Sequence, residues 1–186
     1  MYNDGKSHTV LFKNDSAIRR GCVIIGEYWR YFLYVLDHKT NVLVECWKEG
    51  LYFQGIIHDM SKFKPVEFFP YAHKFYSKRK DELTDSRWKK AWLHHQNHNK
   101  HHWEYWIVNK HTQEALPMPR KYWVEMVCDW RAFSRKWGRK VKEPQLVDRM
   151  MNSEGVILHP ETRAELERFL AVRESGTNHE QAGSDD

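Results

Sequence analysis

The sequence predicts an all-α fold, a single domain built as a helical bundle of six to eight helices. Apolar residues recur at steps of three and four over several long stretches, which is the period of an amphipathic helix. No stretch shows the two-residue alternation that a half-buried strand requires. With 186 residues, of which 41% are hydrophobic, the chain is long enough for one domain with its own core.

Glycines, prolines and capping residues divide the chain into elements. Residues 1–14 are polar and lack a long period, so we expect them to form a loose N-terminal arm. From 17 to about 48 the apolar period predicts one long helix or two joined helices, ended by Gly50. Further helices are predicted at residues 51–62, 66–76, 87–101, 120–138, 144–152 and 160–172. Residues 173–186 are expected to be a disordered tail, which leaves 15–172 as the folded domain.

The composition excludes several classes of protein. The 30 Lys and Arg against 25 Asp and Glu give a net charge of +5, which permits an anionic ligand but does not demand a nucleic acid. The three cysteines, Cys22, Cys46 and Cys128, are too few and too widely spaced for a disulfide framework or a zinc-thiolate site. A reducing cytoplasm is therefore the expected compartment. We expect neither a signal peptide nor a membrane span, because no apolar run approaches about 18 residues.

Histidine is the unusual component of this sequence. There are twelve histidines in the chain, and five of them fall within nine residues: His94, His95, His98, His101 and His102. If the predicted helix continues through them, His95, His98 and His102 share one face, and His94, His98 and His101 share a neighbouring one. Spacing alone does not separate these two sets.

A second chemical signal is the dipeptide His58-Asp59, which we expect to lie inside the helix predicted at 51–62. One imidazole and one carboxylate form a mixed nitrogen and oxygen site of the type that suits Mn, Fe, Co, Ni or Zn. Two ligands do not define a transition-metal site, so others must come from other helices. His38 and Asp129 are candidates, because both lie among apolar residues in predicted helices. A carboxylate buried there needs a partner, for which the alternatives are a metal ion and a basic side chain.

The order His38, His58-Asp59 and Asp129 in an all-α chain resembles the HD-domain superfamily of metal-dependent phosphohydrolases. Lys62 follows the dipeptide as in the HD-x-x-K form of several branches of that superfamily. The run from Ala91 to Trp106 also resembles a family of small His-rich bacterial and phage proteins, which implies no activity. The HD resemblance implies an HD-like helical bundle that holds one or two divalent transition-metal ions and hydrolyses a nucleotide or another small phosphoester.

The resemblance also implies roles for individual residues. In its two-metal branches, two additional histidines lie between the dipeptide and the last aspartate, which favours His95 and His102, then His101, then His94 as further metal ligands. Asp59 and Lys62 are the expected catalytic residues. Lys62, Arg30 and His98 are the expected contacts to the phosphorylated substrate.

Alternative interpretations remain open for each signal. The histidines could form a solvated polar face, and a His-rich HD-like site could hold a di-iron centre that oxidises small molecules. The protein could also be a non-enzymatic nucleic-acid binder, although this partner is not favoured, because a basic helix face is usually only solvated. The basic residues concerned are Arg131, Arg135, Lys136, Arg139, Lys140 and Lys142. Neither the substrate nor the oligomeric state is predicted by the sequence.

Overall fold

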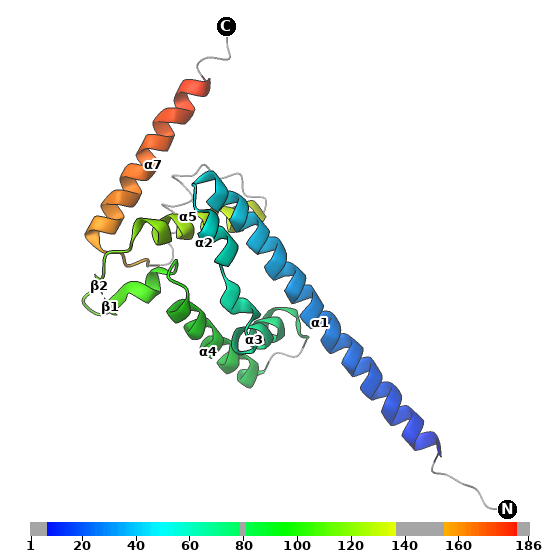
Figure 1. Cartoon of the computed structure of the whole chain (residues 1–186). Coiled ribbons are helices and arrows are strands. Elements are labelled where there is room, and N and C mark those ends of the chain that lie inside the picture. Colours follow the sequence, from blue (N-terminus) through cyan, green and yellow to red (C-terminus); the bar gives the residue numbers. More distant parts are fainter. Residues whose placement is uncertain (1–6, 79–80, 137–154, 182–186) are drawn as a thin grey trace, which may run out of the picture.

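The computed structural model describes residues 7–78, 81–136 and 155–181 (Figure 1). In these residues six α-helices and a single two-stranded hairpin are present. The all-α prediction is therefore confirmed. The predicted helix at 144–152 lies outside the described residues.

The longest element is α1 (Ser7–Lys48), which forms one unbroken helix. Its buried residues, such as Tyr31, Val35 and Val42, recur at helical spacing and face the rest of the protein. The helix ends where Gly50 adopts a φ of +71°, a left-handed conformation that glycine tolerates. The prediction of a loose arm is wrong for residues 7–14, which belong to α1.

A short helix, α2 (Tyr52–Ile57), packs closely against α1 through Gly55. A Cβ atom at Gly55 would lie 2.9 Å from the Leu43 side chain and 3.0 Å from that of Cys46, so only glycine permits this approach. The 3-10 turn η1 (Met60–Phe63) follows. Two residues without helical structure therefore separate α2 from η1, where the sequence predicts one continuous helix.

Helices α3 (Pro65–Tyr76) and α4 (Glu82–His98) form a pair beside α1. Pro65 occupies the first turn of α3, as its fixed φ favours. The carboxylate of Asp81 caps α4 by accepting a hydrogen bond from the Thr84 amide at 2.7 Å. Accordingly α4 begins five residues before the predicted start at 87, and it ends at His98 instead of 101. An aromatic cluster that includes Tyr31, Tyr71 and Trp88 joins these helices to α1.

A small hairpin was not predicted. After the 3-10 turn η2 (Trp103–Trp106), strand β1 (Ile107–Asn109) pairs antiparallel with β2 (Glu114–Ala115). Ile107 lies opposite Ala115. The strands are too short for alternation to be recognisable in the sequence.

Helix α5 (Arg120–Lys136) forms the main core with α1 and α7 (Pro160–Gln181). This core contains Val42, Trp123, Val127 and Leu166. The predicted end at Gly138 lies outside the described residues. Helix α7 extends to Gln181, so residues 173–181 are helical and the expectation of a disordered tail from 173 is wrong for them.

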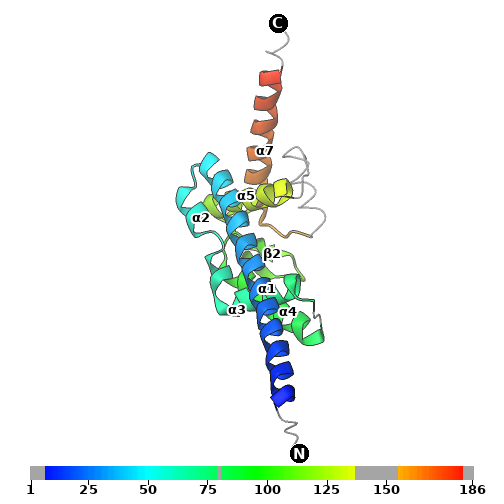
Figure 2. The ribbon, with the colours of Figure 1, turned by 90° about the vertical axis from the view of Figure 1, so that its right-hand side faces the viewer.

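The two views show how these elements meet (Figure 2). Helices α2, α3, α4 and α5 lie along one side of the C-terminal half of α1, while the N-terminal part of α1 extends away from them. The side chains where α1, the α2–η1 connection, α4 and α5 meet include most of the candidate metal ligands.

Candidate metal centre

The backbone at His58 and Asp59 places both side chains in the interior. His58 follows the last residue of α2 with an extended ψ of 129°, and Asp59 has a φ of +54° in the left-handed region. Asp tolerates this conformation better than most non-glycine residues do. Lys39 fixes the connection by donating to the carbonyl oxygens of Ile56 and, at 2.8 Å, His58. The dipeptide thus lies at a break between helices, and our expectation that it lies inside one is wrong.

Four predicted ligands come together in a first group. His38 Nε2 of α1 lies 3.0 Å from Asp129 Oδ1 of α5 and 3.8 Å from Asp59 Oδ2. His58 Nε2 lies 3.4 Å from Asp59 Oδ2 and 3.8 Å from Asp129 Oδ1. Ligands about 2.1 Å from one ion lie roughly 3.0–3.5 Å apart in tetrahedral or octahedral geometry. These separations are therefore close to those of a shared ion.

A second group surrounds the other oxygen of the same carboxylate. Asp59 Oδ1 lies 3.3 Å from His95 Nε2 and 3.5 Å from His101 Nε2. His102 has a ring nitrogen within 4.8 Å of the ligand atoms of these three residues. His95 belongs to α4, but His101 and His102 follow its end. The two helical faces considered from spacing are therefore not the arrangement that the fold uses, because the chain turns after His98.

Three ligand atoms in these groups are buried and lack a hydrogen-bond partner: His58 Nε2, His101 Nε2 and Asp59 Oδ1. An unsatisfied buried polar atom is costly, and such atoms need an explanation. Here each of the three atoms lies among potential ligand atoms of the neighbouring histidines and aspartates. A divalent cation in each group would satisfy them, one at His58 Nε2 and one between Asp59 Oδ1 and His101 Nε2, so the residues present fit a metal ion.

Two buried glutamates hold the histidine rings. Glu125 Oε1 lies 3.0 Å from His58 Nδ1 and 3.2 Å from His101 Nδ1, so one carboxylate contacts a histidine of each group. Glu67 Oε2 lies 2.9 Å from His95 Nδ1 and accepts a 2.9 Å hydrogen bond from Ser61. A carboxylate can only accept, so each Nδ1 donates and each Nε2 is left to face the cluster. This is the second layer of support that metal-binding histidines usually have.

Neither glutamate was identified from the sequence, although a signal for both is present. Glu125 lies between Val124 and Met126, and Glu67 lies between Val66 and Phe68. The argument that selected Asp129, a carboxylate among bulky apolar residues of a helix, applies equally to these two.

The charges in the cluster are strongly coupled. Burial raises the pKa of Asp59, but the charges of the neighbouring histidines lower it by more. The pKa of Asp59 is therefore held well below its usual value. For His58, burial favours the neutral ring, but the charge of Asp59 and the contact of His58 Nδ1 with Glu125 raise the pKa to about 10. For His101, burial and the positive charges of His58 and His102 lower the pKa to about 4. A metal ion binding here must displace the proton from His58.

Lys62 reaches the cluster from η1. Its Nζ lies 2.7 Å from Asp59 Oδ2. Burial disfavours the charged amine, but the negative charges of Asp59 and Asp129 raise its pKa. A positive charge therefore lies beside Asp59, and the predicted role of Lys62 toward a phosphate stays a prediction.

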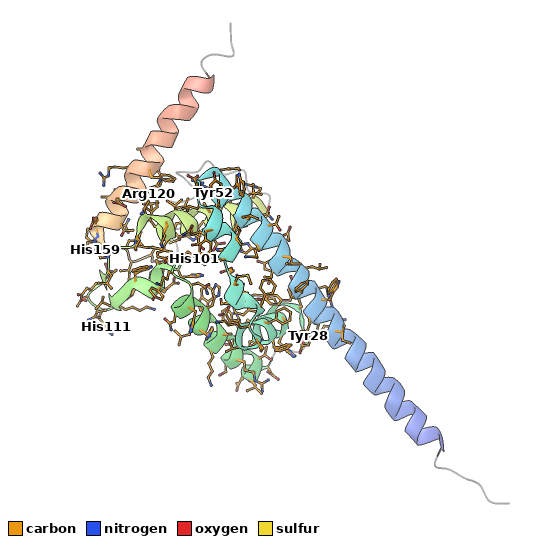
Figure 3. All side chains as sticks on the ribbon, in the orientation of Figure 1. Tyr28, Tyr52, His101, His111, Arg120 and His159 are labelled. Atoms are coloured by element: carbon orange, nitrogen blue, oxygen red, sulfur yellow. The ribbon has the colours of Figure 1, made fainter. Side chains whose placement is uncertain are left out.

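Three other predicted residues do not join the metal groups. His94 Nδ1 lies 2.6 Å from Glu67 Oε1, and the His94 ring stacks on His98. His98 is exposed and its Nδ1 contacts the His94 carbonyl. Arg30 is also exposed, two helical turns from His38, and its Nε donates to the Gly26 carbonyl. Figure 3 shows His101 in the interior, whereas His111 lies at the edge of the molecule.

The basic helix face is partly neutralised by α1. Arg131 pairs with Glu49 at 2.6 Å, and Arg135 pairs with Glu45. Lys136, Arg139, Lys140 and Lys142 have no described side chains. Trp88, Trp92, Trp103 and Trp106 are partly buried against the two cores. The described part of this surface therefore offers few free cations to a nucleic acid.

The fold and the cluster define the class of this protein: it is an all-α protein with a buried histidine and aspartate site that could hold a metal ion. The chain belongs to a family of unknown function, DUF5662, whose model matches residues 27–172. The matched range includes every ligand of both groups. Neither the curated proteins nor the solved structures contain a match to the chain. Among the described residues, no helix has the length and apolarity that crossing a membrane requires.

Proposed function

We propose that the protein is a metal-dependent phosphohydrolase of the HD-domain type, acting on a nucleotide or another small phosphoester. The observation that supports this function is the position of Asp59. Its Oδ2 atom faces His38 and His58, and its Oδ1 atom faces His95 and His101. The two oxygens of one carboxylate would thus both help to hold metal, and paired divalent ions suit phosphoryl transfer.

The proposed ligands are His38, His58 and Asp59, with Asp129 beside His38, for one ion, and Asp59, His95, His101 and His102 for a second. Asp129 also offers an oxygen within reach of His58 and His101. Mn, Fe, Co, Ni or Zn suits this mixture of imidazole and carboxylate. Such ions, when bound, lower the pKa of water to supply a hydroxide nucleophile and polarise a phosphoryl oxygen.

The remaining roles belong to the side chains around the ligands. Glu125 and Glu67 orient the histidine rings through Nδ1. Lys62, which lies at Asp59, neutralises negative charge on the phosphoryl group. The free thiols of Cys46 and Cys128 suit the reducing cytoplasm that we propose as the compartment.

The test measures metal content and hydrolysis together. The purified protein, stripped with EDTA and reloaded with Mn²⁺, Co²⁺ or Ni²⁺, is assayed against nucleotides and generic phosphodiesters. We expect hydrolysis that EDTA abolishes and metal restores. Asp59→Ala should lose both metal and activity, because it removes a ligand of both groups. His111→Ala, at an exposed histidine of the hairpin, is the matched control and should keep both.

Absence of hydrolysis in the fully loaded wild type would contradict the phosphohydrolase proposal. Retention of all metal in Asp59→Ala would contradict the metal site itself. These two outcomes are separable, because metal content is measured independently of turnover.

A di-iron oxygenase is the second candidate. The observation that favours it is the number of imidazoles, since five histidines occur in the two groups and iron accepts such ligands. Anaerobic purification followed by metal analysis and optical spectroscopy distinguishes the two. Two irons per chain with a charge-transfer band that changes on exposure to oxygen would favour the oxygenase.

A further inference from the structure

The outer face of α1 is apolar along its length beside the body. The positions that point away from the body follow steps of four, four and three: Ile25, Trp29, Leu33, Leu36, Thr40, Val44 and Trp47. Six of these seven residues are large and hydrophobic, and Ile25, Trp29 and Trp47 are 67%, 58% and 60% exposed. A helix that packs on a core normally presents polar residues on this side. We call this row of residues the α1 stripe.

The apolar surface continues from the α1 stripe onto α2. The Trp47 ring contacts the Tyr52 ring, with 4.5 Å between their centroids. Phe53, Ile56 and Ile57 of α2 are also exposed, and Gly55 holds α2 directly against α1. Figure 3 labels Tyr28 and Tyr52, which lie near the two ends of this region.

The size of this surface exceeds what an isolated protein normally exposes. A large apolar side chain presents on the order of 150–250 Å² when free, so ten such residues at about half exposure present roughly 1,000 Å². Contiguous apolar patches on monomers rarely exceed a few hundred Å². A standard protein interface buries about 800 Å² on each partner. The surface is therefore large enough for a stable interface.

The path of α1 points to the nature of the partner. Its N-terminal part extends beyond α2, α3 and α5 (Figures 1 and 2), and a helix without tertiary packing is only marginally stable in water. The α1 stripe carries no charged residue, so a strongly charged partner finds no complement there. A second α1 lying alongside would cover the stripe and at the same time support the extended part of both helices.

We propose that two copies of this chain associate through their α1 stripes and the adjoining surface of α2. The contact is isologous, with the same residues contributed by both copies. It is independent of the proposed phosphohydrolase activity, because the stripe lies on the side of α1 opposite His38.

Analytical ultracentrifugation of the full chain tests this proposal. The wild type should sediment with twice the 22.6 kDa mass of one chain. Leu33→Glu and, separately, Trp47→Glu place two buried charges in the contact and should each raise the dimer dissociation constant by about 30-fold or more. Because both side chains are exposed in the single chain, circular dichroism should show that the body stays folded, with any loss of helix content limited to the extended part of α1.

Leu83→Glu is the matched control, since Leu83 is exposed to a similar degree at the start of α4, away from the stripe. It should remain dimeric. A monomeric wild type would overturn the proposal, as would a dimer that persists unchanged in both stripe variants. A monomer that binds vesicles of anionic phospholipid through Trp29 and Trp47 would overturn it too and assign the stripe to a membrane surface.

Discussion

The two faces of α1 each depart in part from the usual pattern of a helix, because polar side chains are buried among the apolar ones on the inner face and large apolar side chains are exposed on the outer face. The inner face carries His38 and Glu45, which are buried. The outer face carries Trp29, Leu33 and Trp47, which are exposed. Globular proteins ordinarily bury the apolar side and leave the polar side in water.

Each departure has a physical cost that the single chain does not recover. Buried polar groups need partners, and the cluster that the inner face lines through His38 contains three buried atoms without a hydrogen-bond partner, all of them on neighbouring segments. Exposed apolar groups remain hydrated until another surface covers them. The two faces therefore correspond to the two proposals made above, a cation held on the inside and a second copy of the chain on the outside.

The largest effect should follow from substituting the inner face alone. His38→Ala removes a ligand that lies 3.0 Å from Asp129, so we expect metal content to fall from two ions per chain to one. Leu36→Ala, two residues away on the outer face, should leave metal content unchanged. Elemental analysis after dialysis measures the metal content of both variants. Equal metal content in the two would contradict a metal-binding role for the inner face of α1.

A smaller effect is expected one layer further from the ions. Glu125→Gln weakens the support of His58 and His101 together, and loss of such support typically lowers metal affinity by about 10–100-fold. Glu67→Gln affects His95 but neither of those rings, so it should weaken only one of the two binding steps. Calorimetric titration of metal into the stripped variants resolves the steps. If Glu125→Gln altered only one step, Glu125 would not link the two groups.

The smallest effect concerns pH, in the metal-free protein. Between pH 6.5 and about 4, His101 is protonated in the unfolded chain but not in the folded chain. The free energy of unfolding therefore falls as pH drops through this range. Between pH 6.5 and about 10, the folded chain keeps a proton on His58 that the unfolded chain has released, so stability falls as pH rises. The melting temperature in EDTA should therefore be highest near pH 6.5.

Thermal unfolding followed by circular dichroism across this range checks that expectation. His101→Gln should flatten the acid side of the profile and leave the alkaline side. The outer face of α1 adds nothing to the profile, because the α1 stripe holds no titratable group. A profile that rises or falls steadily through pH 6.5 would show that neither histidine dominates.

The sequence predicted the long helices and the first ligand group because both depend on local patterns. The apolar period identified α1, α3 and α5, and apolar neighbours identified His38 and Asp129. Other features depend on tertiary contacts that leave no local signal. The helix break at His58-Asp59 contains no glycine or proline from which it could be predicted. It is stabilised by Lys39, which is distant in sequence and donates a hydrogen bond to the His58 carbonyl oxygen.

The same limit explains the choice among the histidines. Their spacing on an ideal helix gave two neighbouring faces that it did not separate, and the resemblance favoured His95 and His102. In the structure α4 ends at His98 and the chain then turns. That turn brings His101 to Asp59 and leaves His98 exposed. Helix α4 packs against α3 and η1, and the spacing of the histidines contains no information about where the helix ends.

The left-handed backbone at Asp59 means that folding and metal binding restrict the residue at this position in different ways. Its φ of +54° disfavours most side chains, by about 1–2 kcal/mol for an ordinary residue, and admits Gly, Asn and Asp most readily. A library randomised at this position and sorted for folding alone should therefore be enriched in these three residues. Sorting the same library for metal retention should leave Asp, so the difference between the two enriched pools isolates what the carboxylate contributes beyond the shape of the chain.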